Sequence, residues 1–249
     1  MQINLTDQVV VVTGASSGIG ASTAKMMAES GAKVLAIGRH KERLQEIAGS
    51  SKSIIPVEAD LVDDKALDAI ADAARAAGGR IHSLVHTAGH FENATFEETP
   101  VSQLEDFFKV HVRAPFLLTQ KLLPMIRPKG TIIFYSSIVA HVGFAPYAAY
   151  TAAKGAIESM ARSLAIEFAP EIRVNIVAPG FTFTPMMTNQ FDVTAGMEEA
   201  IRVRTPLGFI GGPEHCAAMT VLLCSDHGSY ISGQTIVVDG GWKNQGFQA

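Results

Sequence analysis

Short apolar runs recur along the chain and alternate with longer stretches of helical period. The most regular run is Val9–Val12, four consecutive β-branched residues, which favours a strand buried on both faces of a parallel sheet. We expect further strands at 33–38, 54–59, 81–87, 131–135, 173–178 and 235–238. Helical patterns lie between them, among them 64–77, 101–126, 150–168 and 213–224. This alternation predicts βαβ crossovers and therefore an α/β fold with a parallel sheet.

Two stretches depart from the regular alternation. Pro115 and Pro124 interrupt the helical pattern 101–126, and a proline inside a helix kinks or breaks it. Residues 181–210 are rich in Thr, Met and Phe and weakly periodic, which indicates an irregular substrate loop or lid beside a binding site. The 249 residues otherwise suit one domain, 1–249, with a substantial core.

Composition narrows the class of protein. Apolar residues make up 47% of the chain and charged residues 18%, which is typical of a globular protein. The net charge of -4 gives no reason to expect nucleic acid or an anionic membrane as a partner. Residues 131–153 carry no Lys, Arg, Asp or Glu, but their serines, tyrosines and proline favour a strand, a loop and a helix start over a membrane span. The first five residues lack a signal-peptide pattern and the two cysteines lack neighbouring ligands, so we expect a cytoplasmic protein without a metal site.

A glycine-rich turn follows the first strand. Gly14, Gly18 and Gly20 have the spacing Gly-x-x-x-Gly-x-Gly and open a helical pattern. Free backbone N–H groups and the positive end of the helix dipole then point at one spot, which predicts an anion site. Glycine also lets a phosphate approach the backbone closely. An ordinary turn between strand and helix has the same outline, but the context favours a dinucleotide site.

The end of the second strand bears on the choice of nucleotide. An acidic residue at this position usually binds the ribose 2′-OH, whereas here Gly38 is followed by Arg39. A guanidinium pairs with a 2′-phosphate, so we predict NADP(H) over NAD(H). Alternatively, Arg39 is solvated and both cofactors are accepted. Asp60, after the third strand, is a candidate acceptor for the adenine amino group or else a turn cap.

A tyrosine and a lysine mark the candidate chemical centre. Tyr150 and Lys154 form Tyr-x-x-x-Lys near a helix start, so they lie on one face one turn apart. An ammonium about 4 Å from the phenol favours the phenolate, which predicts a lowered pKa for Tyr150. Ser137 ends the fifth strand, at the functional edge of a parallel sheet, where its hydroxyl can bind a carbonyl oxygen. Without Ser137, a helix-surface pair would be the simpler interpretation.

These residues and their order resemble the short-chain dehydrogenase/reductase family over nearly the whole chain. The matching segments are Thr13-Gly-Ala-Ser-Ser-Gly-Ile-Gly20, Asp60-Leu61, Ala88-Gly89, Ser137, Tyr150-Thr-Ala-Ala-Lys154, Pro179-Gly180 with Thr184, and Ser232-Gly-Gln-Thr-Ile-Val-Val-Asp-Gly-Gly241. The resemblance implies a Rossmann-like, doubly wound parallel sheet of about seven strands with helices on both faces. It also implies a homotetramer.

The resemblance further implies roles for single residues. Tyr150 acts as the acid/base, Lys154 binds the nicotinamide ribose and lowers the tyrosine pKa, and Ser137 orients the carbonyl. The implied cofactor-binding residues are Gly14, Ser16, Ser17, Gly18, Ile19, Gly20, Arg39, Asp60, Leu61, Ala88, Gly89, Tyr150, Lys154, Pro179, Gly180, Thr182 and Thr184. We therefore predict an oxidoreductase that interconverts a ketone or aldehyde with an alcohol by hydride transfer.

The chain departs from the family pattern at two places. His86-Thr87 stands where the family has two asparagines that help to fix the sheet and the adenosine side of the cofactor. His111 stands where the family has the asparagine that supports a water leading to the lysine. His111 either keeps this role through its carbonyl or breaks the relay, and a packed helix histidine is the simplest alternative.

Residues around these motifs suggest the kind of substrate. The candidate pocket residues are Val139, Phe144, Tyr147, Phe181, Met186 and Met187, with His90 and His141 nearby. This set is apolar, which favours a neutral or apolar carbonyl compound as the small-molecule partner. A non-catalytic NADP(H)-binding sensor or scaffold is the main alternative function, because the asparagines are lost. An epimerase or dehydratase uses the same Tyr/Lys pair, but such relatives are usually longer and have a different glycine spacing.

Overall fold

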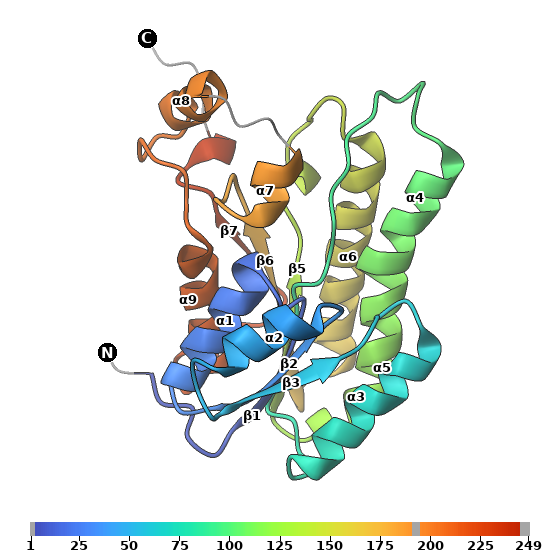
Figure 1. Ribbon diagram of the computed structural model, residues 1–249, viewed down its shortest axis with the longest axis vertical. Coiled ribbons are helices and arrows are strands. Elements are labelled where there is room, and N and C mark those ends of the chain that lie inside the picture. Colours follow the sequence, from blue (N-terminus) through green and yellow to red (C-terminus); the bar gives the residue numbers. More distant parts are fainter. Residues whose placement is uncertain (1–2, 191–194, 245–249) are drawn as a thin grey trace.

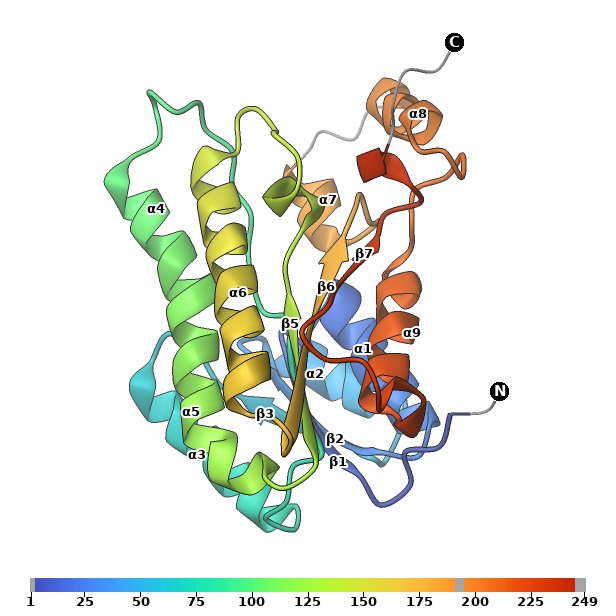
Figure 2. The same ribbon diagram turned by 180° about the vertical axis from the view of Figure 1, so that it is seen from behind.

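A parallel β-sheet runs through the molecule, and helices cover both of its faces (Figures 1 and 2). The computed structural model describes residues 3–190 and 195–244. In these residues the sheet has seven strands, in the order β3-β2-β1-β4-β5-β6-β7, and all neighbours pair in parallel. The strands are β1 (Val9–Thr13), β2 (Lys33–Gly38), β3 (Ile54–Glu58), β4 (Ser83–His86), β5 (Gly130–Tyr135), β6 (Ile172–Pro179) and β7 (Thr235–Val238). The Rossmann-like, doubly wound fold predicted from the sequence is confirmed.

Side chains alternate along each strand and supply two cores. Val10 and Val12 pack with α1 (Gly18–Glu29), α2 (Lys41–Ala48) and α9 (Pro213–Cys224). Val11 packs on the other face with α3 (Asp64–Ala76), α5 (Ala114–Ile126) and α6 (Ala148–Glu167). All three valines are fully buried, which is why this strand is apolar at every position.

The chain reverses its direction across the sheet between β1 and β4. It runs outward from β1 to β3 and then returns to place β4 on the other side of β1. The loops that follow β1 and β4 therefore lie against each other, so that a Cβ on Gly14 would be 2.7 Å from the Cα of Ala88. Such a switch point at the carboxyl ends of the strands is where this class of sheet binds ligands.

The long helical pattern 101–126 is interrupted differently from our prediction. It forms α4 (Val101–Phe108), a π-helical turn (Lys109–Arg113) and α5. The pattern is interrupted just before Pro115, in the first turn of α5, whereas the expected interruption at Pro124 is wrong, because this proline lies inside α5 and does not end it. Pro115 has no N–H to donate to the carbonyl of His111 four residues earlier, and the helix widens there.

Two helices occupy the stretch 181–210 that we expected to be irregular. They are α7 (Pro185–Gln190) and α8 (Ala195–Arg204), and both lie beyond the carboxyl ends of the strands (Figure 1). Residues 191–194 of the expected lid lie outside the described residues. The described residues also form three 3-10 turns, which are Ile138–Ala140 after β5, Asp226–Gly228 after α9 and Trp242–Asn244 after β7.

The uncharged stretch 131–153 folds as predicted. It contains β5, the turn Ile138–Ala140 and the start of α6. Among the described residues, no helix combines the length and the apolar character that crossing a membrane requires.

Candidate active site

Two adjoining cavities open at the carboxyl end of the sheet. The glycine-turn cavity, about 490 Å³, lies along the loops after β1, β2, β3 and β4. The Tyr150 cavity, about 170 Å³, lies between β5, α6 and the segment after β6. Both are lined by Ile19, Thr87, Gly89, Thr184 and Met186, so a ligand that fills the first reaches the second.

The glycine turn leaves its backbone open to the cavity. Gly14 and Gly18 have φ of +65° and +53°, a conformation that favours glycine. A Cβ on Gly20 would lie 2.3 Å from the carbonyl oxygen of Gly14, so a larger residue displaces the turn. Within the described part of the chain, no side chain caps the N-terminus of α1 at Ser17. The exposed N–H groups and the helix dipole therefore fit an anionic group such as a pyrophosphate.

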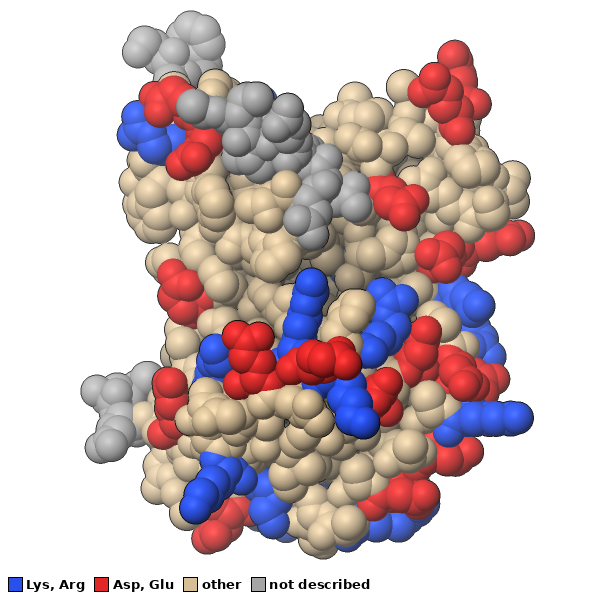
Figure 3. All heavy atoms as spheres, viewed as in Figure 1, with Lys and Arg blue, Asp and Glu red and all other residues tan. Residues whose placement is uncertain are grey.

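The remaining predicted residues of the nucleotide half also line this cavity. They are Ser16, Ser17, Gly18, Ile19, Gly20, Arg39, Asp60, Leu61, Ala88, Gly89 and Thr184. His40 and Arg43 join Arg39 there, so the cavity is basic next to the end of β2. Figure 3 shows Lys and Arg side chains mixed with acidic ones across the middle of this face, over α2, below a largely uncharged area beside α7. The carboxylate of Asp60 accepts a hydrogen bond from Val62 N–H (3.1 Å) and so caps a turn, which is the alternative role considered for this residue.

His86 and Thr87 hold the sheet together where the family has asparagines. The Thr87 hydroxyl donates to the carbonyl of Thr13 (2.5 Å), which ties β4 to β1. His86 Nε2 lies 3.0 Å from Thr119 Oγ1 on α5, and its ring stacks on Phe134 at 4.9 Å. Burial lowers the pKa of His86 to about 3, so the ring is neutral. This pair supplies cross-strand contacts without the amide side chains.

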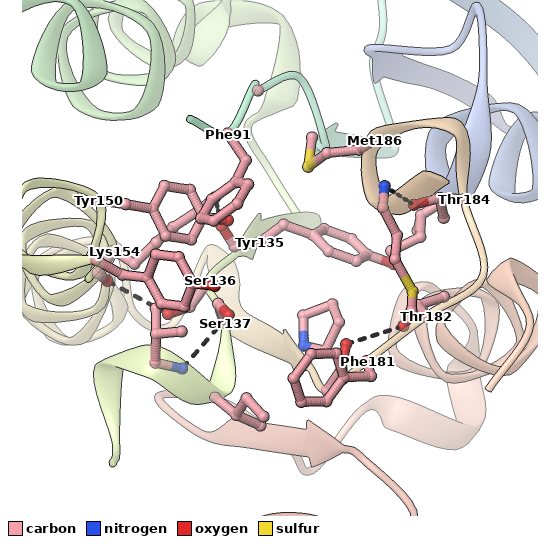
Figure 4. A pocket seen from close by; sticks show the side chains of 18 of the residues that line it. Phe91, Tyr135, Ser136, Ser137, Tyr150, Lys154, Phe181, Thr182, Thr184 and Met186 are labelled. Carbon is pink, nitrogen blue, oxygen red and sulfur yellow. Dashed lines mark hydrogen bonds between the residues drawn. The ribbon is translucent and has the colours of Figure 1, made fainter. Parts of the chain in front are cut away.

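Ser137, Tyr150 and Lys154 come together in the Tyr150 cavity. Ser137 caps the turn Ile138–Ala140 shortly after β5 ends at Tyr135, Tyr150 lies in the first turn of α6 and Lys154 lies one turn further. Figure 4 shows these side chains facing Phe181, Thr182, Thr184 and Met186 across the cavity. The Lys154 ammonium donates to the carbonyl of Tyr135 (3.0 Å), and its Nζ is 5.5 Å from the ring centroid of Tyr150. The Ser137 hydroxyl accepts from Val139 N–H (3.4 Å), which leaves its own proton to donate.

The predicted lowering of the Tyr150 pKa is wrong for this structure. Burial raises the pKa of Tyr150 and lowers that of Lys154 from 10.5 to about 7. Both side chains are at most 9% exposed, so desolvation disfavours the phenolate and the ammonium alike. Tyr150 is therefore a neutral phenol with a proton to give, and Lys154 titrates near neutral pH.

Three rings hold the phenol of Tyr150 in place. Phe91, Phe107 and His111 meet its ring edge-on, with centroids 5.0, 5.6 and 5.5 Å away. His111 Nε2 lies 2.9 Å from the carbonyl oxygen of His90, and burial lowers the pKa of His111 well below its usual value. The side chain of His111 is thus a packed, neutral ring that also lines the cavity, as the simplest alternative had it.

The sequence missed Phe91 and Phe107. No pattern marks Phe107 beyond its helical position, but Phe91 follows the Ala88-Gly89 motif by two residues, which was a usable signal.

The other predicted pocket residues divide between the two cavities. Pro179, Gly180 and Thr182 line the Tyr150 cavity, not the glycine-turn cavity. The apolar residues there are those expected: Val139, Phe144, Tyr147, Phe181, Met186 and Met187. His90 lines the glycine-turn cavity instead, where its Nε2 lies 3.0 Å from Asp106. His141 is not among the described lining residues of either cavity; it follows the turn Ile138–Ala140, whose Val139 lines the Tyr150 cavity, and its Nε2 lies 2.9 Å from Glu158.

Comparison with known proteins gives consistent relatives. A family model described as enoyl-(acyl carrier protein) reductase matches residues 14–243. The NADP-dependent (R)-specific alcohol dehydrogenase of Lentilactobacillus kefiri is 33% identical, over 98% of this chain and 100% of that protein. The 3-oxoacyl-(acyl-carrier-protein) reductase of Thermotoga maritima is 34% identical, over 96% and 99%.

Solved structures give the same grouping. A short-chain dehydrogenase/reductase described as a glucose/ribitol dehydrogenase from Brucella melitensis superposes with a TM-score of 0.93 at 30% identity, covering 100% of both chains. A 3-ketoacyl-(acyl-carrier-protein) reductase from Brucella melitensis, complexed with NADH, superposes with a TM-score of 0.90 at 32% identity, covering 96% of this chain and 100% of that one.

Proposed function

Because this chain belongs to the short-chain dehydrogenase/reductase family, we propose that it is an NADP(H)-dependent oxidoreductase that interconverts a ketone or aldehyde with an alcohol. One observation carries the proposal: Ser137, Tyr150 and Lys154 line a single cavity that shares its wall with the glycine-turn cavity. A carbonyl in the Tyr150 cavity thus lies next to whatever the glycine turn binds. The apolar lining supports a neutral or apolar substrate.

The residues present fit a nicotinamide dinucleotide. The open N–H groups at Gly18–Gly20 suit its pyrophosphate, and Pro179, Gly180, Thr182 and Thr184, which line the Tyr150 cavity, would hold its nicotinamide end. When bound, the nicotinamide supplies or accepts the hydride.

Side chains of this protein bind and protonate the carbonyl oxygen of the substrate. Ser137 donates a hydrogen bond to the carbonyl oxygen, and the neutral phenol of Tyr150 gives its proton to the same oxygen as it gains negative charge. Lys154, beside the ring of Tyr150, stabilises the phenolate that remains. The three rings around Tyr150 hold the phenol in one position, which keeps the donor aligned.

Replacing Tyr150 by Phe tests the chemistry directly. The phenylalanine keeps the ring packing and removes the proton donor, so kcat/KM for ketone reduction should fall by about 100- to 10,000-fold. NADPH binding, followed by thermal shift, should stay close to wild type. Near-wild-type turnover by Tyr150→Phe would remove this residue from the mechanism. A wild-type protein that binds NADPH but reduces no member of a ketone and aldehyde panel would favour the sensor or scaffold function instead.

The preference for NADP(H) rests on the basic end of β2. Arg39, with His40 and Arg43 beside it, lines the glycine-turn cavity, and a guanidinium binds a phosphate through two parallel hydrogen bonds. Arg39→Asp should therefore lower the ratio of kcat/KM with NADPH to that with NADH by about 10- to 100-fold. Arg75→Asp, on the exposed face of α3, is the matched control for charge reversal. A wild-type enzyme that prefers NADH would contradict this preference.

A homotetramer is the proposed assembly. Leu104, Phe108 and Phe116 are 37%, 38% and 47% exposed along α4 and α5, which supports a contact between copies through these helices. Light scattering coupled to size exclusion measures the mass, and Phe116→Glu should reduce it. A monomeric wild-type protein would contradict the assembly.

A further inference from the structure

One aromatic side chain stands behind the wall of the Tyr150 cavity without lining it. Trp242 begins the 3-10 turn Trp242–Asn244 and is 7% exposed. Its ring stacks on Phe144 with centroids 4.9 Å apart and planes 21° apart, and it meets Phe181 edge-on at 5.6 Å. Phe144 and Phe181 both line the cavity and contact each other at 6.0 Å. The position of Trp242 thus decides how far these two rings reach into the cavity.

The turn that carries Trp242 is fixed at its base. The carboxylate of Asp239 accepts N–H groups from Gly241 (2.8 Å) and Lys243 (2.7 Å). A Cβ on Gly180, a cavity residue, would lie 2.6 Å from the Cβ of Asp239, so the two backbones are in close contact. These backbone contacts, in addition to the packing of its own ring, therefore fix the position of Trp242 relative to the cavity.

A second group holds the indole from the segment beyond α7. The guanidinium carbon of Arg204, the last residue of α8, lies 4.3 Å from the ring centroid of Trp242, within cation–π range. The backbone joins the same segments, because Leu207 N–H donates to the carbonyl of Gly240 (3.1 Å). Trp242 thus links α8 to Phe144 and Phe181, which come from two other loops.

The lining of the cavity indicates what this wall meets. Lys154 is the one charged side chain among the described lining residues, and its ammonium donates to the carbonyl of Tyr135, so the lining favours an uncharged substrate over a phosphate or carboxylate. Flat aromatic walls pack best against a flat apolar group, face-on or edge-on. The cavity of about 170 Å³ also receives the nicotinamide end in the proposed function, so the space that remains suits a compact molecule more than an extended chain.

We propose that Trp242 is a specificity-determining residue that limits the depth of the Tyr150 cavity. This inference rests on the proposed function and extends it, in that the substrate is an uncharged ketone bearing a single aryl-sized ring. The ring of the substrate lies against Phe144 and Phe181, opposite Tyr150. Trp242 supports both phenylalanines from behind and so rejects larger fused rings.

Truncation of Trp242 tests the depth limit. The probes are acetophenone and 2-acetonaphthone, which differ by one fused ring, reduced with NADPH. Trp242→Ala lets Phe144 and Phe181 retreat, so the ratio of kcat/KM for the naphthyl over the phenyl ketone should rise by at least about 10-fold. Trp242→Phe keeps a ring behind Phe144 and should change the ratio less. Tyr230→Ala removes a fully exposed aromatic residue outside both cavities and serves as the control.

Fluorescence gives a second readout that needs neither turnover nor a variant. Trp242 is the single tryptophan of the chain, so its emission reports on this wall alone. With oxidised nicotinamide cofactor saturating, acetophenone should shift or quench the emission, and a small aliphatic ketone such as acetone should do so much less.

The outcomes separate the two proposals. An unchanged naphthyl-to-phenyl ratio in a folded Trp242→Ala, or an emission that acetophenone does not alter in a wild type that reduces it, would overturn the role of Trp242. If the wild type reduces no ketone but acetophenone still alters the emission, the proposed reaction fails and the aryl site stands.

Discussion

Backbone forms much of the glycine-turn cavity, whereas side chains form most of the Tyr150 cavity. In the first, Gly14 and Gly20 lie so close to neighbouring backbone that a Cβ on either would overlap it, and the helix terminus supplies the polar groups. In the second, rings and thioethers from β5, α6 and the segment after β6 enclose a nearly uncharged space. The difference teaches where each cavity tolerates change. Adding an atom to a closely packed backbone displaces that backbone. Replacing one side chain by another instead changes the shape of a cavity in small steps, as substrate specificity requires.

The largest effect is expected from an added methyl group in the backbone-built cavity. In Gly20→Ala, the Cβ would lie 2.3 Å from the carbonyl oxygen of Gly14 and 2.5 Å from Thr87 Oγ1, so the turn must move. We expect a loss of about 1–3 kcal/mol in the free energy of unfolding, as for other overpacked sites. NADPH affinity should fall at least about 100-fold, because the N–H groups that face the anion move with the turn. Denaturant unfolding and NADPH titration measure the two effects, and unchanged values for both would refute the close packing.

The side-chain cavity is probed through its buried ammonium. The pKa of Lys154 is about 7 in the folded protein against an ordinary 10.5, so between these pH values the unfolded chain binds one more proton. The free energy of unfolding therefore rises with pH in this window. This gain in stability disappears as the pH falls toward 7. Lys154→Met keeps the length of the side chain and removes the titration. From pH 7 to 8.5, the wild type should gain about 2 kcal/mol relative to the variant.

Comparing wild type with Lys154→Met cancels the other groups that titrate in this range. Burial raises the pKa of Cys216 and Cys224 to about 12 and about 11, which opposes the gain at higher pH but affects both proteins equally. Parallel stability curves over pH 7–8.5 would show that Lys154 does not titrate there.

The smallest effect is expected at a glycine that, unlike Gly20, has room for a Cβ. A Cβ on Gly155, in the middle of α6, would meet nothing within 4 Å other than the backbone of its own helix and its chain neighbours. Gly155→Ala should raise the free energy of unfolding by about 0.5–1 kcal/mol, because alanine loses less backbone entropy in a helix. It also serves as the control for Gly20→Ala, since NADPH affinity should not change. A destabilised Gly155→Ala would mean that α6 has a close neighbour at this position.

The fold was largely predictable because its signals are local. The run Val9–Val12 forms all of β1 except its last residue, and the segment 213–224 coincides with α9. The errors at strand ends amount to a few residues, as between 81–87 and Ser83–His86. The helical pattern 101–126 was predicted less well, because Pro124 does not end α5 and because the pattern does not say that the helix widens before Pro115 instead of breaking.

The sequence by itself determined the strand-turn-helix at the glycines and brought Tyr150 and Lys154 to one helical face, because both depend on spacing along a few residues. The tertiary structure alone decided which side chains meet across the cavities. Trp242 packs on Phe144 and Arg204 although long stretches of chain separate them, and no periodicity encodes such contacts. It also decided the protonation of the site, because desolvation depends on everything that surrounds a group. That is why the pKa of Tyr150 is raised, although the nearby Lys154 in the sequence predicted that it would be lowered.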